Sequence, residues 1–375
     1  MKFVVEPTEL VDAVNWVARS LSSRPIKPEL LGIMIDVDTS ITLTGSDLET
    51  STKAILKADI SAQGKVLVPG RLLAEIARSL PNKPITFNLD GNRVLVTAGA
   101  AKFTLPTLSV NEYPNLPELP ETAGVIPSDV FAHAVAQVAV ASGKDDSLPT
   151  LTGVHIEIEQ NKITLAATDR YRLAVRELNW QAKDSQIQTS TLVRSRTLSD
   201  AAKSLTAHSQ VTLALSPNTS NEKLIGFISE LKTMTSRTLD GTFPPFKHLL
   251  PTSYVAEATI EVSTFLDSVK RVALVTDKTV PLRLIFANNT LQLEAGAGEE
   301  AQATEELEIV FSGEPINIAF NPQYLTDGLQ AIGTPYVQIN FTGASKPAVL
   351  TGKHEVSGTR DISYQYLLMP MRYSS

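Results

Sequence analysis

The residue types that most often perform chemistry are few in this chain, and their spacing assembles no catalytic centre. The chain has no cysteine, which excludes disulfides, thiolate catalysis and cysteine-ligated metal sites. Its histidines are scattered without the short spacings typical of zinc ligands: His133, His155, His208, His248 and His354. We therefore expect structural or surface roles for the histidines, and no metal or cofactor.

Two short acidic segments offer paired carboxylates, at Asp47-Leu48-Glu49 and Asp145-Asp146. Acidic turns are the simpler interpretation, because no nucleophile accompanies them. The Gly-rich segment AGAGEE at 295–300 lacks the Lys and Ser or Thr of a phosphate-binding loop. The nucleophile-elbow motif GxSxG is also absent from the sequence. We expect a protein that is not an enzyme.

The composition is that of an ordinary globular protein. With 375 residues, 43% hydrophobic and 19% charged, the chain is long enough for two or three domains, each with its own core. No apolar run reaches the roughly 18 residues needed to span a membrane. The start, MKFVVEPTEL, lacks the apolar core of a signal peptide. We expect a cytoplasmic protein.

Two helical elements and one strand recur in each third of the chain. The first helix carries a Val-Ala step, at Val17-Ala18, Val138-Ala139 and Val272-Ala273. The second carries a leucine, at Leu73, Leu198 and Leu325. The strand-like segments are ITLTGSD from Ile41, ITLAATD from Ile163 and LQLEAGA from Leu291. A plan repeated in the same order predicts three similar domains, which we place at 1–122, 123–250 and 251–375.

The elements between these markers indicate an α+β fold with antiparallel sheets. We expect helices over residues 8–21, 70–83, 128–144, 194–207, 263–276 and 321–333. Thr8, Ser128, Ser263 and Asn321 are the expected capping residues. Alternating strands surround the helices, for example around the turn at Gln160-Asn161. Proline-rich connectors end the first and second thirds and predict stiff joints.

The distribution of charge distinguishes the helices from the rest of the chain. The net charge of the whole chain is −7, which argues against indiscriminate binding of nucleic acid. The six expected helices together carry +3, so the remaining residues carry −10. The helices are therefore the less acidic layer.

Several longer segments carry a family resemblance. They are MKF at the start, SRPIKPEL around Arg24, TLTGSDLE at 42–49, VPGRLLAEIARSLP at 68–81, TDRYRLAV at 168–175, LDGTFPPF at 239–246, FNPQYLTDGLQAI at 320–332 and YLLMPMR at 366–372. In these the chain resembles, from end to end, the sliding clamps that are the β subunits of bacterial DNA polymerase III.

The resemblance implies the DNA clamp fold, with sheets outside and two helices per domain inside. It also implies a homodimer closed head to tail into a ring around duplex DNA. Open sheet edges at the two ends of a chain invite such pairing. By similarity, Phe103 and Leu105 would meet Leu274 and Val275 of the other copy. The acids Glu299, Glu300, Glu305 and Glu306 would face Lys102 and Arg93; a solvated strand face is the alternative for them.

In such a clamp the helices line the hole, and Lys and Arg contact phosphates without sequence specificity. The candidates for DNA binding are Arg24, Lys144, Arg19, Arg71, Arg78, Arg194, Arg196, Lys203, Lys270 and Arg271. Arg24 and Lys144 match family positions, whereas the others depend on helix placement. A solvated surface charge is the alternative for each.

The resemblance also implies a pocket for peptides of the polymerase catalytic subunit, the clamp loader and other proteins with a clamp-binding motif anchored by Leu or Phe. Its expected residues are Leu151, Thr168, Arg170, Arg172, Leu173, Pro244, His248, Leu249, Pro347, Leu367, Leu368, Met369, Pro370, Met371 and Arg372. The adaptable methionines suit serial partners, and Arg172 and Arg372 are expected to hold peptide oxygens. Burial of the last strand as core is the alternative for its Leu and Met residues.

One departure from the family concerns the rim of this pocket. Arg170-Tyr171 stand where the family often has Gly-His, so the preference among partners is open. The function implied is a non-catalytic processivity clamp, with any polymerase activity belonging to the holoenzyme. Three alternatives remain at this point: a duplicate clamp that binds or resists a pocket-directed peptide natural product, an α+β scaffold without a DNA role, and an undiscovered enzyme. Ring stability and the opening site are not predicted.

Overall fold

The computed structural model describes residues 1–22, 24–206, 208–217, 220, 222–276, 280–296 and 301–372. Contacts divide the chain into two compact units. The first unit contains residues 1–131, 181–185 and 200–238, and the second contains 132–180, 186–199 and 239–375. Within the described ranges, no helix is long and apolar enough to cross a membrane.

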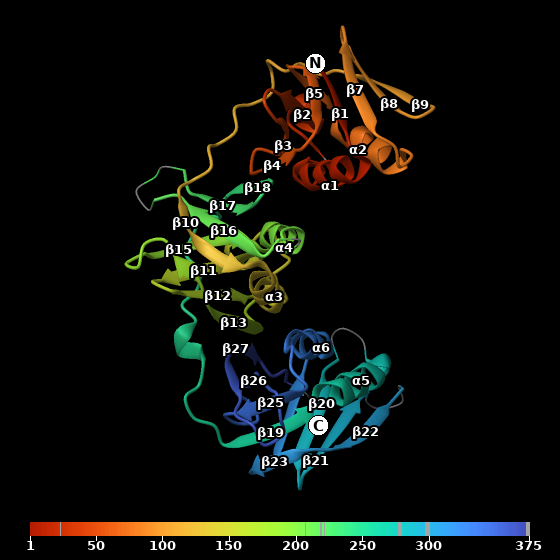
Figure 1. Ribbon diagram of the computed structural model, residues 1–375. Coiled ribbons are helices and arrows are strands. Elements are labelled where there is room, and N and C mark those ends of the chain that lie inside the picture. The colour runs from red at the N-terminus through yellow and green to blue at the C-terminus, as the bar shows by residue number, and fades with distance from the viewer. Residues whose placement is uncertain are drawn as a thin grey trace. The chain divides into compact units, whose positions relative to one another are not determined.

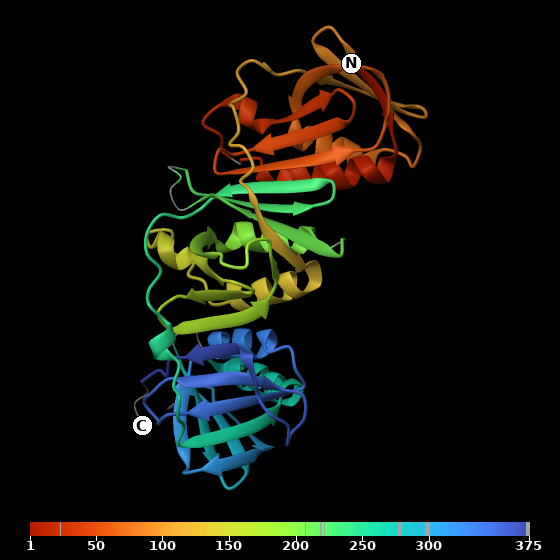
Figure 2. The same cartoon turned by 60° about the vertical axis from the view of Figure 1, so that its left-hand side comes forward.

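The first unit is built on two antiparallel sheets (Figures 1 and 2). The smaller sheet has the order β5 (Asp59–Ala62), β1 (Lys2–Val5), β7 (Ile85–Asp90), β8 (Arg93–Ala98), β9 (Ala101–Pro106). The larger has the order β14 (Gln181–Ala182), β10 (Thr122–Pro127), β16 (Gln210–Leu215), β17 (Leu224–Ser229), β18 (Lys232–Arg237), β4 (Thr50–Leu56), β3 (Ile41–Ser46), β2 (Gly32–Val37), β6 (Gly64–Pro69). Because β18 pairs with β4, strands from the first and second thirds of the sequence share one sheet.

The second unit repeats this plan. Its larger sheet has the order β15 (Gln188–Arg194), β11 (Gly153–Glu159), β12 (Lys162–Thr168), β13 (Arg172–Asn179), β27 (Asp361–Leu368), β26 (Ala348–Lys353), β25 (Tyr336–Phe341), β19 (Ala256–Glu261), β23 (Val310–Gly313). Its smaller sheet has the order β22 (Ala303–Glu308), β21 (Thr290–Ala295), β20 (Leu282–Ala287), β24 (Ile316–Phe320). Here β13 pairs with β27, so the second and third thirds share a sheet as well.

Six α-helices lie among the described residues, near the positions that the sequence predicts but shorter. They are α1 (Pro7–Val17), α2 (Gly70–Ser79), α3 (Ser128–Ala139), α4 (Ser195–Ser204), α5 (Val262–Val272) and α6 (Pro322–Ala331). Short 3₁₀ turns are η1 (Ala18–Ser20), η2 (Pro28–Leu31), η3 (Pro149–Thr152), η4 (Lys247–Leu249) and η5 (Ala273–Val275). Figure 1 shows α1 beside α2 in the first unit and α5 beside α6 in the second, in agreement with their contacts.

Except for Val138, which is the last but one residue of α3, the repeated Val and Leu residues fall at equivalent points of these helices. Val17 and Val272 are the last residues of α1 and α5, and a 3₁₀ turn follows each. Leu73, Leu198 and Leu325 are each the fourth residue of their helix, and each is 0% exposed. The spacing of the repeat therefore records the packing of each helix onto its sheet.

The capping predictions are right at one helix and wrong at two. The side chain of Asn321 accepts hydrogen bonds from the backbone of Gln323 and Tyr324, as a capping residue does. Neither Thr8 nor Ser263 caps a helix, because α1 and α5 begin one residue earlier, after Glu6 and Glu261. In α1, Pro7 fits the first position because its fixed φ suits a helix and its missing N–H would be unpaired there anyway.

Candidate functional site

A tight turn between β12 and β13 forms the centre of the candidate site. Thr168 Oγ1 donates to Arg172 O at 2.7 Å and accepts from Arg170 N at 3.2 Å. Asp169 Oδ1 accepts from Tyr171 N and Arg172 N, both at 3.0 Å. Because Thr168 Oγ1 and Asp169 Oδ1 both form hydrogen bonds with the backbone, the turn has a fixed conformation without a ligand.

Arg172 is buried, and its side chain forms hydrogen bonds within its own chain. Its side chain is 4% exposed, and its Nε donates to Asp169 Oδ2 at 2.9 Å. Its Nη1 donates to Asp327 Oδ2 at 2.6 Å and to Tyr366 Oη at 3.4 Å. Burial alone would lower the pKa of Arg172, but its electrostatic interaction with Tyr366 and its hydrogen bonds to Asp327 and Tyr366 raise that pKa above its usual range. These contacts tie Arg172 to its own chain, and the expectation that it also holds a peptide oxygen stays a prediction.

The rings of Tyr324 and Tyr171 lie beside this guanidinium and together are called the aromatic shelf. The Arg172 guanidinium carbon is 4.3 Å from the centre of the Tyr324 ring. Tyr171 stacks near Tyr324 with ring centres 6.4 Å apart, and 57% of Tyr171 is exposed. The shelf offers a flat apolar surface that borders solvent.

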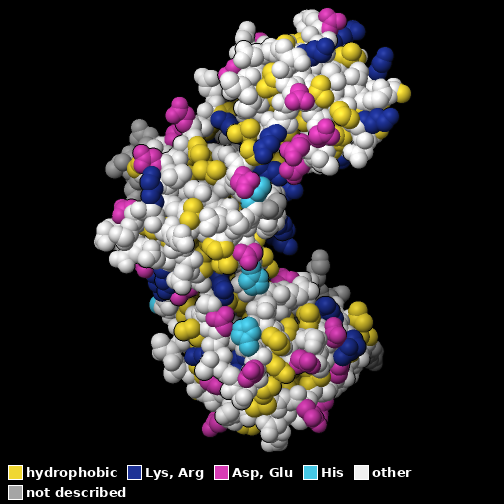
Figure 3. All heavy atoms as spheres, viewed as in Figure 1, with side chains coloured by type: hydrophobic (Ala, Val, Ile, Leu, Met, Phe, Trp, Pro, Cys, Tyr) yellow, Lys and Arg dark blue, Asp and Glu magenta, His cyan; other side chains and the backbone are white. Residues whose placement is uncertain are grey.

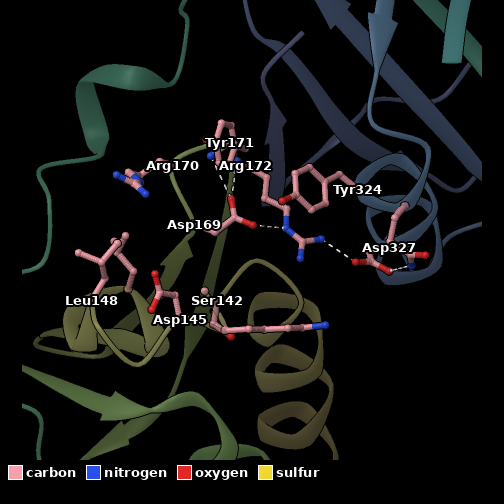
Figure 4. Close-up of a pocket in the computed structure, with 13 residues that line it drawn as sticks. Ser142, Asp145, Leu148, Asp169, Arg170, Tyr171, Arg172, Tyr324 and Asp327 are labelled. Atoms are coloured by element: carbon pink, nitrogen blue, oxygen red, sulfur yellow. Dashed lines mark hydrogen bonds and ion pairs between the residues drawn. The ribbon is translucent and has the colours of Figure 1, made fainter. Parts of the chain in front are cut away.

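The turn borders a cavity of about 470 Å³ within the second unit. Figure 4 shows the turn between helix α6, which carries Asp327, and the segment from Ser142 to Leu148; Arg172 points toward α6, whereas Arg170 points to the opposite side. Four residues of the expected peptide pocket and its rim line the cavity: Leu151, Arg170, Tyr171 and Arg172. The sequence interpretation missed Ser142, Gly143, Asp145, Leu148, Asp169, Gln323, Tyr324 and Asp327, which also line it, and it assigned Lys144 to DNA instead.

The remaining pocket residues lie outside this cavity and differ in exposure. Leu173 and Leu367 belong to a buried apolar cluster with Phe243 and Phe246. Leu368 is also fully buried, so these strand residues pack in the core. The exposed or partly exposed members are Thr168, Pro244, His248, Leu249, Pro347, Met369, Pro370, Met371 and Arg372.

The C-terminal tail leaves the sheet directly after the buried leucines. Met369 N donates to Tyr171 O at 2.9 Å, and Met371 N donates to Ala319 O at 2.8 Å. The side chain of Met369 is 40% exposed. The tail is thus held by its backbone while Met369 faces solvent next to the turn.

The ten expected DNA-binding residues are all exposed. In the first unit, Arg78 donates two hydrogen bonds to Asn15 Oδ1, which link α2 to α1. In the second unit, Lys144 and Lys270 line one cavity of about 920 Å³ at the start of α6. On the face drawn in Figure 3, basic and acidic side chains are mixed within each unit, without one continuous basic patch.

Each of the four sheets in the described chain ends in two edge strands, and two of these eight strands carry residues of the expected dimer interface. They are β9, at the end of the smaller sheet of the first unit, and β22, at the end of the smaller sheet of the second unit. Among the expected interface residues, Leu274 is 83% exposed, whereas Leu105 is 0% exposed and packs in the core of its own unit. Phe103 and Val275 are partly exposed, and Lys102 and Arg93 are exposed.

The expected interface acids are only partly accessible to a partner. Glu305 binds Arg271 and Ser268 of its own chain. The hydrogen bond from Arg271, and to a smaller extent that from Ser268, lowers the pKa of Glu305 below its usual value. Glu306 is exposed on β22, and Glu299 and Glu300 lie outside the described residues.

The histidines make contacts that suit structural roles. The ring of His155 stacks on Phe243 with centres 5.1 Å apart, and burial lowers the pKa of His155. His208 lies 3.2 Å from a carboxylate oxygen of Glu230. In the part of the chain that the structure describes, no group of three or more His, Cys, Asp or Glu could hold a metal.

Family models match nearly the whole chain in three segments. The description for residues 1–117 is "DNA polymerase III beta subunit, N-terminal domain", and the central and C-terminal domains of that subunit match 125–245 and 247–372. Among known proteins, the chain is 48% identical to the "Beta sliding clamp" of Streptomyces coelicolor, with 100% of both chains covered. It is 41% identical, again with 100% of both covered, to the "Beta sliding clamp homolog GriR" of Streptomyces muensis.

Solved structures agree with these matches. The DNA polymerase sliding clamp of Bacillus subtilis is similar at 25% identity with a TM-score of 0.91, and 100% of both chains is covered. A Pseudomonas aeruginosa sliding clamp described as bound to griselimycin is similar at 26% identity, with the same TM-score and coverage.

Proposed function

The chain belongs to the bacterial DNA polymerase III β-subunit family, the sliding clamps, and we propose on that basis that it encircles duplex DNA and confers processivity on the replicative polymerase. The observation that carries the proposal is 48% identity to a sliding clamp over the full length of both chains. The fold is the three-domain clamp fold of that family, and we propose domain limits at 1–122, 123–250 and 251–375.

We propose that two copies join head to tail through β9 of one copy and β22 of the other. Each strand has one side without a hydrogen-bonded neighbour strand within the described chain, and such edges favour pairing. Closing the ring would pair both edges and cover Leu274, which a monomer exposes. Phe103 and Val275 would contribute their exposed parts, while Leu105 would support the strand from inside.

We propose that DNA passes through the ring with contacts to phosphates only. The ten exposed Lys and Arg candidates are dispersed over both units, and acidic residues are interspersed. Dispersed contacts give weak, salt-sensitive attraction, so retention comes from the closed ring rather than from affinity. This arrangement suits a protein that slides.

We propose that peptides of the polymerase catalytic subunit, the clamp loader and other partners bind beside the 168–172 turn. Support comes from the exposed Leu249 and Met369, the aromatic shelf, and the 470 Å³ cavity. Apolar surface with a few fixed polar groups is typical of such pockets. As a family of processivity factors, the clamps act through binding, and we propose that this chain has no catalytic activity and acts in the cytoplasm.

The topological part of the proposal is tested by loading the protein onto nicked circular DNA and then linearising the DNA. We expect the protein to stay on the circle and to leave the linear form. The same rate of loss from both forms would contradict encirclement.

A second candidate is a duplicate clamp that binds a pocket-directed natural product. Two observations favour testing it: the 41% identity to the homolog GriR, and the P. aeruginosa clamp described with griselimycin bound. Rescue of growth after depletion of the principal clamp of the same cell would support the first candidate. Failure to rescue, together with tight binding of the compound, would support the second.

A further inference from the structure

We infer that Arg170 selects among peptide partners by binding an acidic side chain beside their apolar anchor. The inference rests on the proposed peptide pocket and adds a residue-level rule for its specificity. Three observations support it: the backbone conformation of the 168–172 turn, the different contacts of its two arginines, and the groups around Arg170.

The turn that presents Arg170 occurs twice in the chain. Between β3 and β4, Ser46 Oγ donates to Thr50 O at 3.0 Å and accepts from Leu48 N at 3.1 Å. Asp47 Oδ1 accepts from Glu49 N at 3.0 Å and from Thr50 N at 2.7 Å. These four hydrogen bonds match those of the 168–172 turn one for one.

The two turns also share an unusual backbone angle. Leu48 and Arg170 occupy the same place, and each has a φ of 79°. Glycine adopts this left-handed region without the steric cost that a side chain incurs. The two turns have the same backbone conformation, and each has a side chain at the position with positive φ. They differ in the chemistry of that side chain, which is leucine at residue 48 and arginine at residue 170.

Of the two arginines in the second turn, only Arg170 has a guanidinium free for a ligand. Arg172 is 4% exposed and bound to Asp169 and Asp327. Arg170 is exposed, and among the described residues its guanidinium makes no hydrogen bond or ion pair. The acid that shares the cavity with it, Asp145, accepts from Ser147 N at 2.9 Å, and hydrogen bonds from Ser147 together with the nearby charge of Arg170 lower the pKa of Asp145.

The surroundings of Arg170 favour a peptide carboxylate as the ligand. Tyr171 and Met369 offer exposed apolar surface next to the turn, and Leu148 lines the same cavity. A guanidinium binds Asp or Glu through two parallel hydrogen bonds, which imposes direction as well as attraction. Because Arg170 is exposed, its charge adds little affinity and acts mainly as a selector, worth about three- to fivefold between partners.

The inference is tested with pairs of short peptides that share a Leu-Phe anchor and differ by Asp or Asn at one of the three preceding positions. Dissociation constants are measured at low salt for the full-length protein. At one position or more, we expect the Asp peptide to bind about three- to fivefold more tightly. Arg170→Gln should abolish the difference, Arg170→Lys should keep part of it, and the exposed control Lys162→Gln should keep all of it.

Each other outcome overturns the inference in a distinguishable way. Equal binding of Asp and Asn peptides at every position, or a preference that survives Arg170→Gln, removes the selector but leaves the pocket. Failure of every peptide to bind removes the pocket and the selector together. A loss of affinity for duplex DNA in Arg170→Gln with the Asp preference intact would make Arg170 a DNA contact instead.

Discussion

Arg172 Nη1 and Asp327 Oδ2 lie 2.6 Å apart, and this contact ties strand β13 to helix α6. Asp327 also accepts a hydrogen bond from Gln323, one turn earlier in α6, at 2.7 Å. Helix α6 therefore stabilises the 168–172 turn beside the proposed pocket. The first residues of α6 also line the cavity of about 920 Å³, together with Lys144 and Lys270. A buried cation held in this way fixes the position of the rim residues in the same turn.

Replacement of Asp327 by Asn should lower the free energy of unfolding of the second unit by about 1–3 kcal/mol, because a buried guanidinium loses its charged partner. Urea unfolding is followed by the fluorescence of Trp180, in a Trp16→Phe background that removes the other tryptophan.

Glu177→Gln is the matched control for this change. The Lys162–Glu177 ion pair has an N–O distance of 2.6 Å, as Arg172–Asp327 has, but its side chains are 45% and 44% exposed. Its removal should cost less than about 1 kcal/mol. Equal costs for the two variants would show that burial of Arg172 does not matter.

The repeat and the α+β class could be predicted from sequence because helix and strand periodicities are local. The repeated Leu73, Leu198 and Leu325 indicated the helix positions, and each packs as expected. Helix ends were less predictable: α3 ends at Ala139 rather than at residue 144, and Ser128 donates to His208 O, which lies 80 residues away.

The bracing of the site could not be predicted in the same way. Arg172 meets Asp327, 155 residues further along the chain, and nothing local to either residue predicts that contact. The one local signal was the recurring Ser/Thr-Asp pair at Ser46-Asp47 and Thr168-Asp169, which specifies the turn. It marks the scaffold of the site, whereas the differing side chains after it carry the specificity.

Truncation after Leu368 should abolish binding of anchor peptides and leave the dimer intact. The buried Leu367 and Leu368 remain in β27, so the sheet keeps its pairing with β13 and β26. The truncation removes Met369, which is exposed next to the turn, and the backbone hydrogen bond of Met371 to Ala319. Peptide titration measures the loss of binding, and sedimentation checks that the dimer persists. Unchanged peptide affinity would show that the tail is not part of the pocket.

Replacement of Leu274 by Asp should convert the dimer to a monomer. Leu274 is 83% exposed in the single chain, so the change should spare folding but place a charge in a proposed apolar interface. Sedimentation should shift from about 81 kDa, twice the chain mass of 40.5 kDa, to the mass of one chain. Ile362→Asp, at a residue 61% exposed on β27, is the control and should stay dimeric. A Leu274→Asp dimer of unchanged stability would place the interface elsewhere.

The double replacement Lys144→Glu and Lys270→Glu should weaken the affinity for linear duplex DNA and flatten the dependence of that affinity on salt, while retention on nicked circular DNA, which the closed ring provides, should not change. Both lysines are exposed on one cavity, and removing one lysine–phosphate interaction should reduce the slope of log affinity against log salt by about 0.9. The control pair, Lys162→Glu and Lys346→Glu, changes the net charge equally at two exposed lysines that do not line that cavity. Dissociation constants for linear duplex DNA at several salt concentrations distinguish the two pairs. If both pairs weaken the affinity for duplex DNA equally, the attraction depends on total charge, and Lys144 and Lys270 have no special position toward DNA.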